Sequence, residues 1–299
     1  MPFYFPDTPD LPLPPGHRFP ATKYRLLREA ARAERLFDGV GLLASPLAAV
    51  DDLLLAHEAG YVRGVLEGTL SADAVRRIGI PWSLVLRQRS LATVGGALAS
   101  ARAALRFGIS GQLAGGTHHA HRTFGSGYCV LNDFAVAALA LLDAGDVSRV
   151  TILDCDVHQG DGTAAILADE ARVQTISIHG EKNFPFRKHA SDLDIALPDG
   201  TGDAAYLDAL EIALAAVEHF APDLLLYLSG ADALAADRLG RLSLSPAGLA
   251  ARDTRVFDFA RARQLPVAIA IGGGYAEPID ATVEAYLATF RAARAVYGF

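Results

Sequence analysis

Short apolar runs that each end in glycine or polar residues recur along this chain and alternate with helical segments. Three of them are RVTILDCDVH (149–158), DLLLYLSGAD (223–232) and PVAIAIGGGY (266–275). A strand that is apolar on both sides must be buried on both faces, which is typical of a parallel sheet covered by helices. The chain is therefore predicted to have an α/β fold built on a parallel sheet.

The remaining segments fit the same alternation. The runs GISGQLAGG (108–116) and VQTISIHG (173–180) are two further predicted strands. Apolar periodicity predicts helices over 21–37, 131–145, 203–220, 246–264 and 278–295, and one or two long helices over 81–107 that open at Pro81. The proline-rich residues 1–20 are expected to form an extended N-terminal arm. No linker or repeat divides the 299 residues, so we expect a single domain over 1–299.

Composition excludes several classes of protein. Hydrophobic residues make up 51% of the chain and charged residues 20%, which is incompatible with a disordered chain. The net charge of -7 argues against direct nucleic-acid binding, which needs clustered Lys and Arg. We expect no membrane span and no signal peptide, because no apolar run is long enough. Cys129 and Cys155 are expected to be buried free thiols in a reducing cytoplasm.

Polar and glycine residues collect at the carboxyl ends of four predicted strands. These clusters are Gly115–His119, Asp154–Asp161, Ser229–Asp232 and Gly272–Tyr275. In an open parallel sheet the ligand crevice lies outside the carboxyl ends of the strands. We therefore expect the four clusters to converge in space.

The segment DCDVHQGDG predicts a metal site. If the strand continues through it, Asp154, Asp156 and His158 alternate and point to one side. Two carboxylates and an imidazole on one face favour a bound divalent cation. Asp232, at the end of another strand, completes an Asp-His-Asp set of three ligands, and three protein ligands with an open position are typical of catalytic zinc. Fe(II), Co(II) or Mn(II) also suits such oxygen-rich ligands.

Further polar groups near this set suit acid–base chemistry. His118 and His119 are neighbours, so on a strand they point to opposite sides and cannot easily chelate one ion. One of them is a candidate general base and acid, and Asp154 and Asp161 could orient the two rings. Tyr275 follows three glycines and is a candidate oxyanion donor. The glycines lack the spacing of a phosphate-binding loop.

Five motifs together resemble the histone deacetylase family and occur in the family's order over nearly the whole chain. They are GGTHHAHRTFGSGYCVLNDFAVAA (115–138), LDCDVHQGDGTAAI (153–166), SIHGEKNFPF (177–186), SGADAL (229–234) and GGGYA (272–276). The segment 13–29, and Gln159 where many members have a second histidine, are most similar to class IV and its bacterial relatives.

The resemblance implies the arginase–deacetylase fold, with a mostly parallel sheet of about eight strands flanked by helices. It implies zinc bound by Asp156, His158 and Asp232. It implies a metal-dependent amide hydrolase that removes acetyl or longer acyl groups from lysine side chains of proteins or peptides.

Roles for the other polar residues follow from the same resemblance. It implies that His119, paired with Asp161, is the general base and acid. It implies that His118, paired with Asp154, is an electrostatic partner and that Tyr275 is the oxyanion donor.

The resemblance also implies a substrate tunnel and a structural monovalent cation. The tunnel residues would be Gly127, Tyr128, Phe184, Leu239, Gly273 and Gly274. Residues around the cation, which is K⁺ by this resemblance, would be Asp154, Asp156, His158, Ser177 and Ile178. No role is predicted for His17, Lys23, His57 or Tyr61, although the stretch near His17 could shape an acetate exit path.

Several alternatives share this site or fold. An acetylpolyamine or other small acylamine deacetylase would use the same groups, although such relatives typically carry a long insertion that this compact chain lacks. A preference for longer acyl chains is a second alternative. An arginase-like binuclear manganese enzyme would need more aspartates after Ser229 than Asp232 alone. A non-catalytic acyl-lysine binding protein should have lost part of this machinery. The oligomeric state is left open.

Overall fold

One sheet of eight strands forms the centre of the molecule. The computed structural model describes residues 1–299. All strand pairs are parallel, and the strand order is β2-β1-β3-β8-β7-β4-β5-β6. The strands are β1 (Pro2–Phe5), β2 (Gly41–Ala44), β3 (Ile109–Gln112), β4 (Val150–Asp154), β5 (Val173–Gly180), β6 (Leu193–Leu197), β7 (Leu224–Ser229) and β8 (Val267–Ile271). The predicted parallel sheet and strand number are confirmed.

Both faces of this sheet are buried, as the apolar strands predict. In β7, Leu225 and Tyr227 point into one hydrophobic cluster, and Leu224, Leu226 and Leu228 point into the other. Successive side chains of a strand alternate between the two faces of the sheet. A strand that is buried on both faces is therefore apolar at nearly every position.

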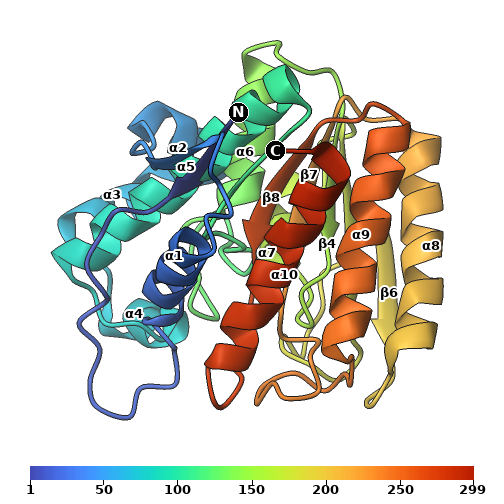
Figure 1. Ribbon diagram of the computed structural model, residues 1–299. Coiled ribbons are helices and arrows are strands. Elements are labelled where there is room, and N and C mark those ends of the chain that lie inside the picture. Colours follow the sequence, from blue (N-terminus) through green and yellow to red (C-terminus); the bar gives the residue numbers. More distant parts are fainter.

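Ten helices form the layers on the two faces. They are α1 (Lys23–Ala33), α2 (Val50–Ala56), α3 (Ala59–Glu67), α4 (Ala72–Ile78), α5 (Leu84–Phe107), α6 (Asp133–Asp143), α7 (Asp161–Leu167), α8 (Asp203–Phe220), α9 (Pro246–Ala262) and α10 (Asp280–Tyr297). Side chains of α1, α8, α9 and α10 belong to one core cluster, and those of α2 to α7 belong to the other. Figure 1 shows α8, α9 and α10 side by side in front of the sheet.

The N-terminal segment is extended, but it is not a free arm. Residues 2–5 form β1, which lies between β2 and β3 in the sheet. The ring of Phe3 is fully buried and lies 4.8 Å from the ring of Phe37 and 4.9 Å from that of Phe299, measured between centroids. The two chain ends therefore lie close together (Figure 1).

Helix boundaries depend on caps that composition alone did not locate. α5 begins at Leu84 rather than at Pro81, because the Ser83 hydroxyl accepts a hydrogen bond from the Leu86 N–H at 3.1 Å. In α9 the Ser245 hydroxyl caps the Gly248 N–H at 3.0 Å, and Pro246 occupies the first turn. The short helices α2, α3, α4 and α7 were not among the predicted elements.

Four neighbouring strands at the centre of the sheet carry the polar clusters. Strands β3, β8, β7 and β4 are adjacent in this order. The segments that follow them are 113–121, 272–275, 230–232 and 155–161. Because the strands are parallel, all four segments leave the same edge of the sheet. The predicted convergence of the clusters is a direct consequence of this strand order.

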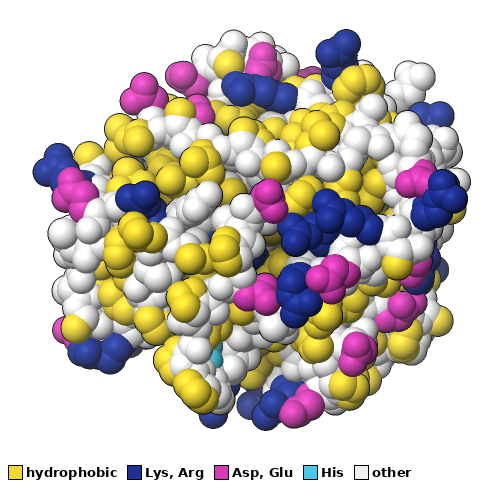
Figure 2. Space-filling model, turned by 60° about the vertical axis from the view of Figure 1, so that its left-hand side comes forward, with side chains coloured by type: hydrophobic (Ala, Val, Ile, Leu, Met, Phe, Trp, Pro, Cys, Tyr) yellow, Lys and Arg dark blue, Asp and Glu magenta, His cyan; other side chains and the backbone are white.

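The surface is mixed in character. Figure 2 shows a face on which hydrophobic side chains lie among charged side chains of both signs. No helix is both long enough and apolar enough to cross a membrane.

Candidate active site and metal centre

The structure brings together three side chains that can hold a metal ion. One ligand atom from each of Asp156, His158 and Asp232 can be chosen so that all lie within 4.8 Å of one another, and all three residues are buried. The Nδ1 atom of His158 lies 3.0 Å from Oδ1 of Asp156 and 3.2 Å from Oδ2 of Asp232. These residues are the three predicted ligands.

The local backbone differs from the prediction. Strand β4 ends at Asp154, so Asp156 and His158 lie in the loop after the strand rather than on a continued strand face. The loop folds back, and the His158 N–H donates to Oδ1 of Asp156 at 2.9 Å. The turn, not a period of two, therefore brings these side chains together.

Backbone groups hold the two carboxylates. The Val157 N–H donates to Oδ1 of Asp232 at 2.9 Å, and the Gly273 N–H donates to Oδ2 of Asp156 at 2.5 Å. Position 273 must be glycine, since a Cβ atom there would overlap the Asp232 carboxylate. Each loop thus fixes a ligand carried by another loop.

The charges of the cluster favour a cation between the ligands. Burial lowers the pKa of His158, but hydrogen bonds and the charges of Asp156 and Asp232 outweigh it and raise that pKa to about 10. Burial and the Asp156 charge raise the pKa of Asp232 to about 7. Two buried carboxylates and an imidazole facing one point are a donor set that fits a divalent ion, with Nδ1 as the nitrogen ligand.

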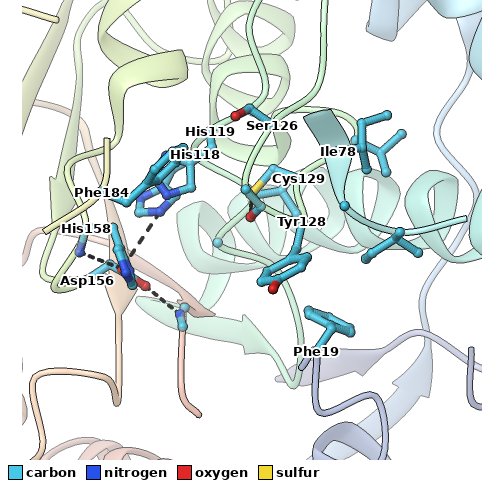
Figure 3. A pocket seen from close by; sticks show the side chains of 18 of the residues that line it. Phe19, Ile78, His118, His119, Ser126, Tyr128, Cys129, Asp156, His158 and Phe184 are labelled. Atoms are coloured by element: carbon cyan, nitrogen blue, oxygen red, sulfur yellow. Dashed lines mark hydrogen bonds and ion pairs between the residues drawn. The ribbon is translucent and has the colours of Figure 1, made fainter. Parts of the chain in front are cut away.

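Two histidine–aspartate pairs lie beside the ligands. His118 Nδ1 is 2.6 Å from Oδ2 of Asp154, and His119 Nδ1 is 2.6 Å from Oδ1 of Asp161. The two imidazole rings lie 4.1 Å apart in a turn, so both face the cavity instead of pointing to opposite sides. Figure 3 shows them next to His158 and Asp156. Each ring is thus hydrogen-bonded to one of the two carboxylates that were expected to orient them.

The two imidazoles differ in their affinity for a proton. Burial lowers the pKa of His118, but Asp154 and Asp156 outweigh burial and raise it to about 9. Burial and the neighbouring His118 lower the pKa of His119 to about 4 despite Asp161. Burial therefore favours the neutral form of His119, whereas the two carboxylates favour the charged form of His118.

Asp161 has a second imidazole partner that the sequence prediction missed. Its Oδ2 atom lies 3.0 Å from Nε2 of His121. The His121 ring stacks on Phe124 with 4.4 Å between centroids. The motif HHAH contains this third histidine, His121, but the sequence did not indicate that its side chain contacts Asp161.

Tyr275 lines the same cavity, and its backbone is held tightly. Its N–H donates to Oδ2 of Asp237 at 2.6 Å, and its hydroxyl makes no hydrogen bond within the protein. Burial raises the pKa of Tyr275 well above its usual value, so the phenol remains a hydrogen-bond donor. The Lys23 ammonium lies 3.3 Å from the Gly272 oxygen, 3.4 Å from the Gly274 oxygen and 5.2 Å from the Tyr275 ring centroid.

A cavity of about 600 Å³ leads from the surface to these groups. Five of the six predicted tunnel residues, all except Gly274, line it. Gly127 has a φ of +52°, and a Cβ atom there would lie 2.6 Å from the His119 ring. The Phe184 ring lies edge-on to His119 with 4.8 Å between centroids. Gly274 instead packs near Thr282 and Tyr286.

The comparison with protein families agrees with this geometry. The family model described as the histone deacetylase domain matches residues 17–292. The chain belongs to the histone deacetylase family. The family resemblance seen in the motifs is thereby confirmed, whereas the likeness to class IV stays a prediction.

Individual relatives cover different shares of the chain. An uncharacterised protein of Picosynechococcus is 43% identical and covers 96% of each chain. Histone deacetylase 2 of Arabidopsis thaliana is 31% identical over 75% of this chain and 60% of its own length. The acetoin utilization protein AcuC of Staphylococcus aureus is 28% identical over 76% of this chain and 64% of its own length.

A solved structure confirms the fold. The HD domain of HDA15 aligns with a TM-score of 0.83 at 21% identity, covering 100% of this chain and 88% of that one. The deacetylase fold expected from the resemblance is therefore present, with an all-parallel sheet rather than a mostly parallel one.

Of the five residues expected around a monovalent cation, Asp154, Ser177 and Ile178 lie on the adjacent strands β4 and β5, and Asp156 and His158 lie in the loop after β4. Asp154 of β4 pairs with Ser177 of β5 in the sheet. The Ser177 hydroxyl lies 2.9 Å from Nδ1 of His179, and Ile178 is fully buried. The K⁺ site stays a prediction.

Three residues without a predicted role hold loops together in the structure. His57 Nε2 accepts the Asn132 N–H at 2.9 Å, so its Nδ1 carries the proton and donates to the His121 oxygen at 2.9 Å. Tyr61 donates to the Val130 oxygen at 2.6 Å. His17 Nε2 lies 2.8 Å from the Gly79 oxygen.

A buried arginine behind the metal ligands was not predicted. Arg252 of α9 is 1% exposed and donates to the oxygen of Gly230 at 2.7 Å and to that of Cys155 at 3.3 Å. Gly230 and Cys155 belong to the loops that carry Asp232 and Asp156. Arg252 lies in a helical segment that contains several charged residues, so the sequence did not indicate that its side chain is buried.

Proposed function

We propose that this protein is a zinc-dependent deacylase that hydrolyses the amide of acyl-lysine side chains in proteins or peptides. The observation that carries the proposal is the adjacency of an Asp-His-Asp cluster and two histidine–aspartate pairs at the end of one cavity. Hydrolysis of an unactivated amide needs a base, an acid and oxyanion stabilisation, and these groups supply all three.

Asp156, His158 and Asp232 would hold the metal ion. When bound, a zinc ion supplies a Lewis acid for the amide carbonyl and lowers the pKa of a bound water toward about 7. Fe(II) is a second ion that such a donor set accepts. The candidate ligands are open to the cavity on one side, because Asp156 and His158 line its wall.

The chain's own groups would divide the proton transfers. The His119 Nδ1–H donates a hydrogen bond to Asp161, so Nε2 is free to accept a proton from the attacking water and to return it to the leaving amine. His118, held by Asp154, places a positive charge beside the reacting carbonyl. Tyr275 would donate its hydroxyl proton to the oxyanion as a hydrogen bond. The products are a free lysine amine and a carboxylate.

The shape of the cavity also supports longer acyl groups as substrates. Its wall extends past the histidines to the apolar side chains of Leu11, Phe19, Ile80, Leu86 and Val130. An acyl chain longer than acetyl would gain about 0.8 kcal/mol for each methylene that it buries there. We propose acyl-lysine with acetyl or longer acyl groups as the substrate class, with small acylated amines as the alternative.

The proposal also covers a structural ion, the cellular compartment and nucleic-acid binding. K⁺ would bind near Asp154 and Ser177 as a structural ion. The two buried free cysteines suit the reducing cytoplasm. The acidic net charge of -7 supports the absence of direct nucleic-acid binding.

The test compares acetyl-, decanoyl- and myristoyl-lysine peptides with wild-type protein, Tyr275→Phe and His119→Ala. Loss of the oxyanion donor should lower kcat by about 10²- to 10³-fold, and loss of the base by about 10²- to 10⁴-fold. Tyr297→Phe is the control, because this half-buried tyrosine forms no hydrogen bond and lies outside the cavity. Unchanged activity in both active-site variants would refute the assignment.

A further inference from the structure

The wall of the cavity is rich in positive charge although the chain as a whole is acidic. The sequence has 34 acidic and 27 basic residues. On the cavity wall, by contrast, the only carboxylate is the metal-ligand candidate Asp156. The basic residues on the wall are Lys23, Arg77, Arg89, Lys182 and Arg241.

Three of these basic residues are exposed around the mouth and come from different elements. Arg77 belongs to α4, Lys182 follows β5, and Arg241 follows β7. The side chains of Lys182 and Arg241 are 65% and 54% exposed. Ile78, next to Arg77 in the sequence, lies across the cavity from Phe184 (Figure 3). The basic groups therefore lie on two sides of the opening, with Arg77 on one side and Lys182 and Arg241 on the other.

Carboxylates near the mouth neutralise only part of this charge. Asp199 lies 3.1 Å from Arg241 and 4.0 Å from Lys182, so one carboxylate serves two cations. Arg77 forms no ion pair and lies 4.6 Å from the centroid of the Phe124 ring. Glu181 adjoins Lys182 in the sequence but does not line the cavity. The mouth thus keeps a net positive charge.

The mouth also offers apolar contact for the lysine stem. Phe186 is 89% exposed and Phe184 is 36% exposed, and both line the cavity. An acyl-lysine whose stem passes these rings into the cavity leaves its peptide backbone at the opening. Neighbouring residues of an extended peptide are spaced by about 3.3 to 3.6 Å, so the residues on either side of the acyl-lysine lie over the basic groups.

We propose that the mouth selects acyl-lysines flanked by Asp or Glu and disfavours cationic substrates such as lysine-rich tails and acylated polyamines. This inference rests on the proposed deacylase function and names its substrate class. Arginine suits the role because its guanidinium binds a carboxylate through two parallel hydrogen bonds. Charged residues at the rim of a site mainly raise the association rate of oppositely charged partners and disfavour partners of like charge.

The direct test uses three peptides with the same acyl-lysine and different flanks, which are aspartates, serines or lysines, together with an acetylated polyamine. We expect kcat/KM to be about tenfold higher for the acidic peptide than for the basic one at about 0.1 M salt, where the screening length is about 10 Å. The difference should nearly vanish at about 1 M salt, where that length is about 3 Å. The KM should change more than kcat.

Charge reversal of single residues at the mouth tests whether these residues cause the preference for acidic flanks. Arg77→Glu should lower the ratio of acidic to basic kcat/KM values by about 5- to 10-fold, because it replaces an attraction by a repulsion. Arg106→Glu is the matched control, since Arg106 is an exposed arginine 5.1 Å from the Phe107 ring centroid and lies outside the cavity. It makes the same change in net charge and should leave the ratio unchanged. Lys182→Glu is the second variant if Arg77→Glu does not fold.

The outcomes separate the inference from the function on which it rests. Hydrolysis of all three peptides at equal kcat/KM would overturn the inference and leave the deacylase proposal standing. A preference that persists at high salt, or that Arg106→Glu changes as much as Arg77→Glu, would also overturn it. Faster hydrolysis of the acetylated polyamine would replace it with the small-amine alternative. No hydrolysis of any of these compounds by metal-loaded protein would overturn both proposals.

Discussion

Single carboxylates in this site serve more than one partner. Asp161 accepts from His119 through one oxygen and from His121 through the other. Asp237 accepts the N–H groups of Tyr275, Leu239 and Gly240, at 2.6, 2.8 and 2.9 Å. A carboxylate anchored at both oxygens keeps one rotamer, so the group that it holds keeps its direction.

We predict that His121 positions Asp161 for His119. His121→Leu removes one of the two hydrogen bonds to a buried carboxylate, which is worth about 1.5 to 3 kcal/mol, and should lower kcat by about tenfold with little change in KM. His121→Gln keeps a donor and should recover most of the activity. Steady-state kinetics of both variants test this. Equal losses in His121→Leu and His121→Gln would show that the ring's stacking on Phe124, not its hydrogen bond, matters.

The sequence showed the residues of the site better than their local conformation. The four clusters were visible because an apolar strand must end where polar residues begin, as at Asp154 and Ser229. The turn that brings His118 and His119 onto one side was not visible, because it depends on packing between loops. His121 and Arg252 were missed for the same reason, since long-range contacts decide their burial.

Among elements, the loop that follows β3 is held by residues far away in the sequence. His57, just after α2, bridges the His121 oxygen and the Asn132 N–H and is 1% exposed. Asn132 caps α6 through the Ala135 N–H at 3.0 Å. The end of α2, the start of α6 and the loop beside the catalytic candidates thus meet at one neutral imidazole.

This imidazole predicts an acid sensitivity. Burial lowers the pKa of His57 in the folded protein from 6.5 to about 4, and its Nε2 is already an acceptor. The unfolded chain therefore binds the proton first as pH falls, and stability is lost between pH 6.5 and about 4. This shift is worth about 3 kcal/mol over the whole window.

Denaturant unfolding at several pH values tests it. His57→Gln should be less stable than wild type at pH 7 but should lose about 3 kcal/mol less on acidification. His219→Gln is the control, because His219 is an exposed histidine in the last turn of α8. A His57→Gln variant with the same pH dependence as wild type would contradict the account.

Helix α9 supports the loops of the candidate metal ligands from behind. Arg252 holds the carbonyls of Gly230 and Cys155, and its Nε lies 2.9 Å from Oδ1 of Asp253. Asp253 in turn accepts from Tyr227 and from Thr289 of α10, at 2.5 and 2.6 Å. The distance between the two loops that carry Asp156 and Asp232 therefore depends on the buried Arg252–Asp253 ion pair of α9, which also contacts β7 and α10.

Loss of this arginine should weaken metal binding. Arg252→Met should raise the Kd for zinc by about 10- to 100-fold, as for other residues that orient metal ligands. Arg255→Met is the control on the same helix, because Arg255 is 43% exposed and pairs only with Glu211 at the surface. Competition with a chromophoric chelator measures both values, and circular dichroism checks the fold. Equal Kd values in folded Arg252→Met and wild type would contradict this role.

At the scale of the whole molecule, the sheet order decides where the site lies. Long apolar runs predicted five strands correctly, and four of these are the adjacent strands β3, β8, β7 and β4. Strand β1 was missed because it lies within the proline-rich residues 1–20, and β2 and β6 were missed because most of their side chains are exposed or half-buried. Their absence from the prediction did not affect the site, since β2 and β6 are the edges of the sheet.

The central claim is that one metal ion, held by Asp156, His158 and Asp232, is required for deacylation. The measurement is a titration of chelator-treated protein with zinc while the release of lysine amine from an acyl-lysine peptide is followed. The account predicts no activity without metal and a linear rise that stops at about one equivalent per chain, because the three ligands form one site. Asp232→Asn should stay inactive throughout. Full activity in the chelator-treated protein, or a rise that stops only at about two equivalents, would contradict it.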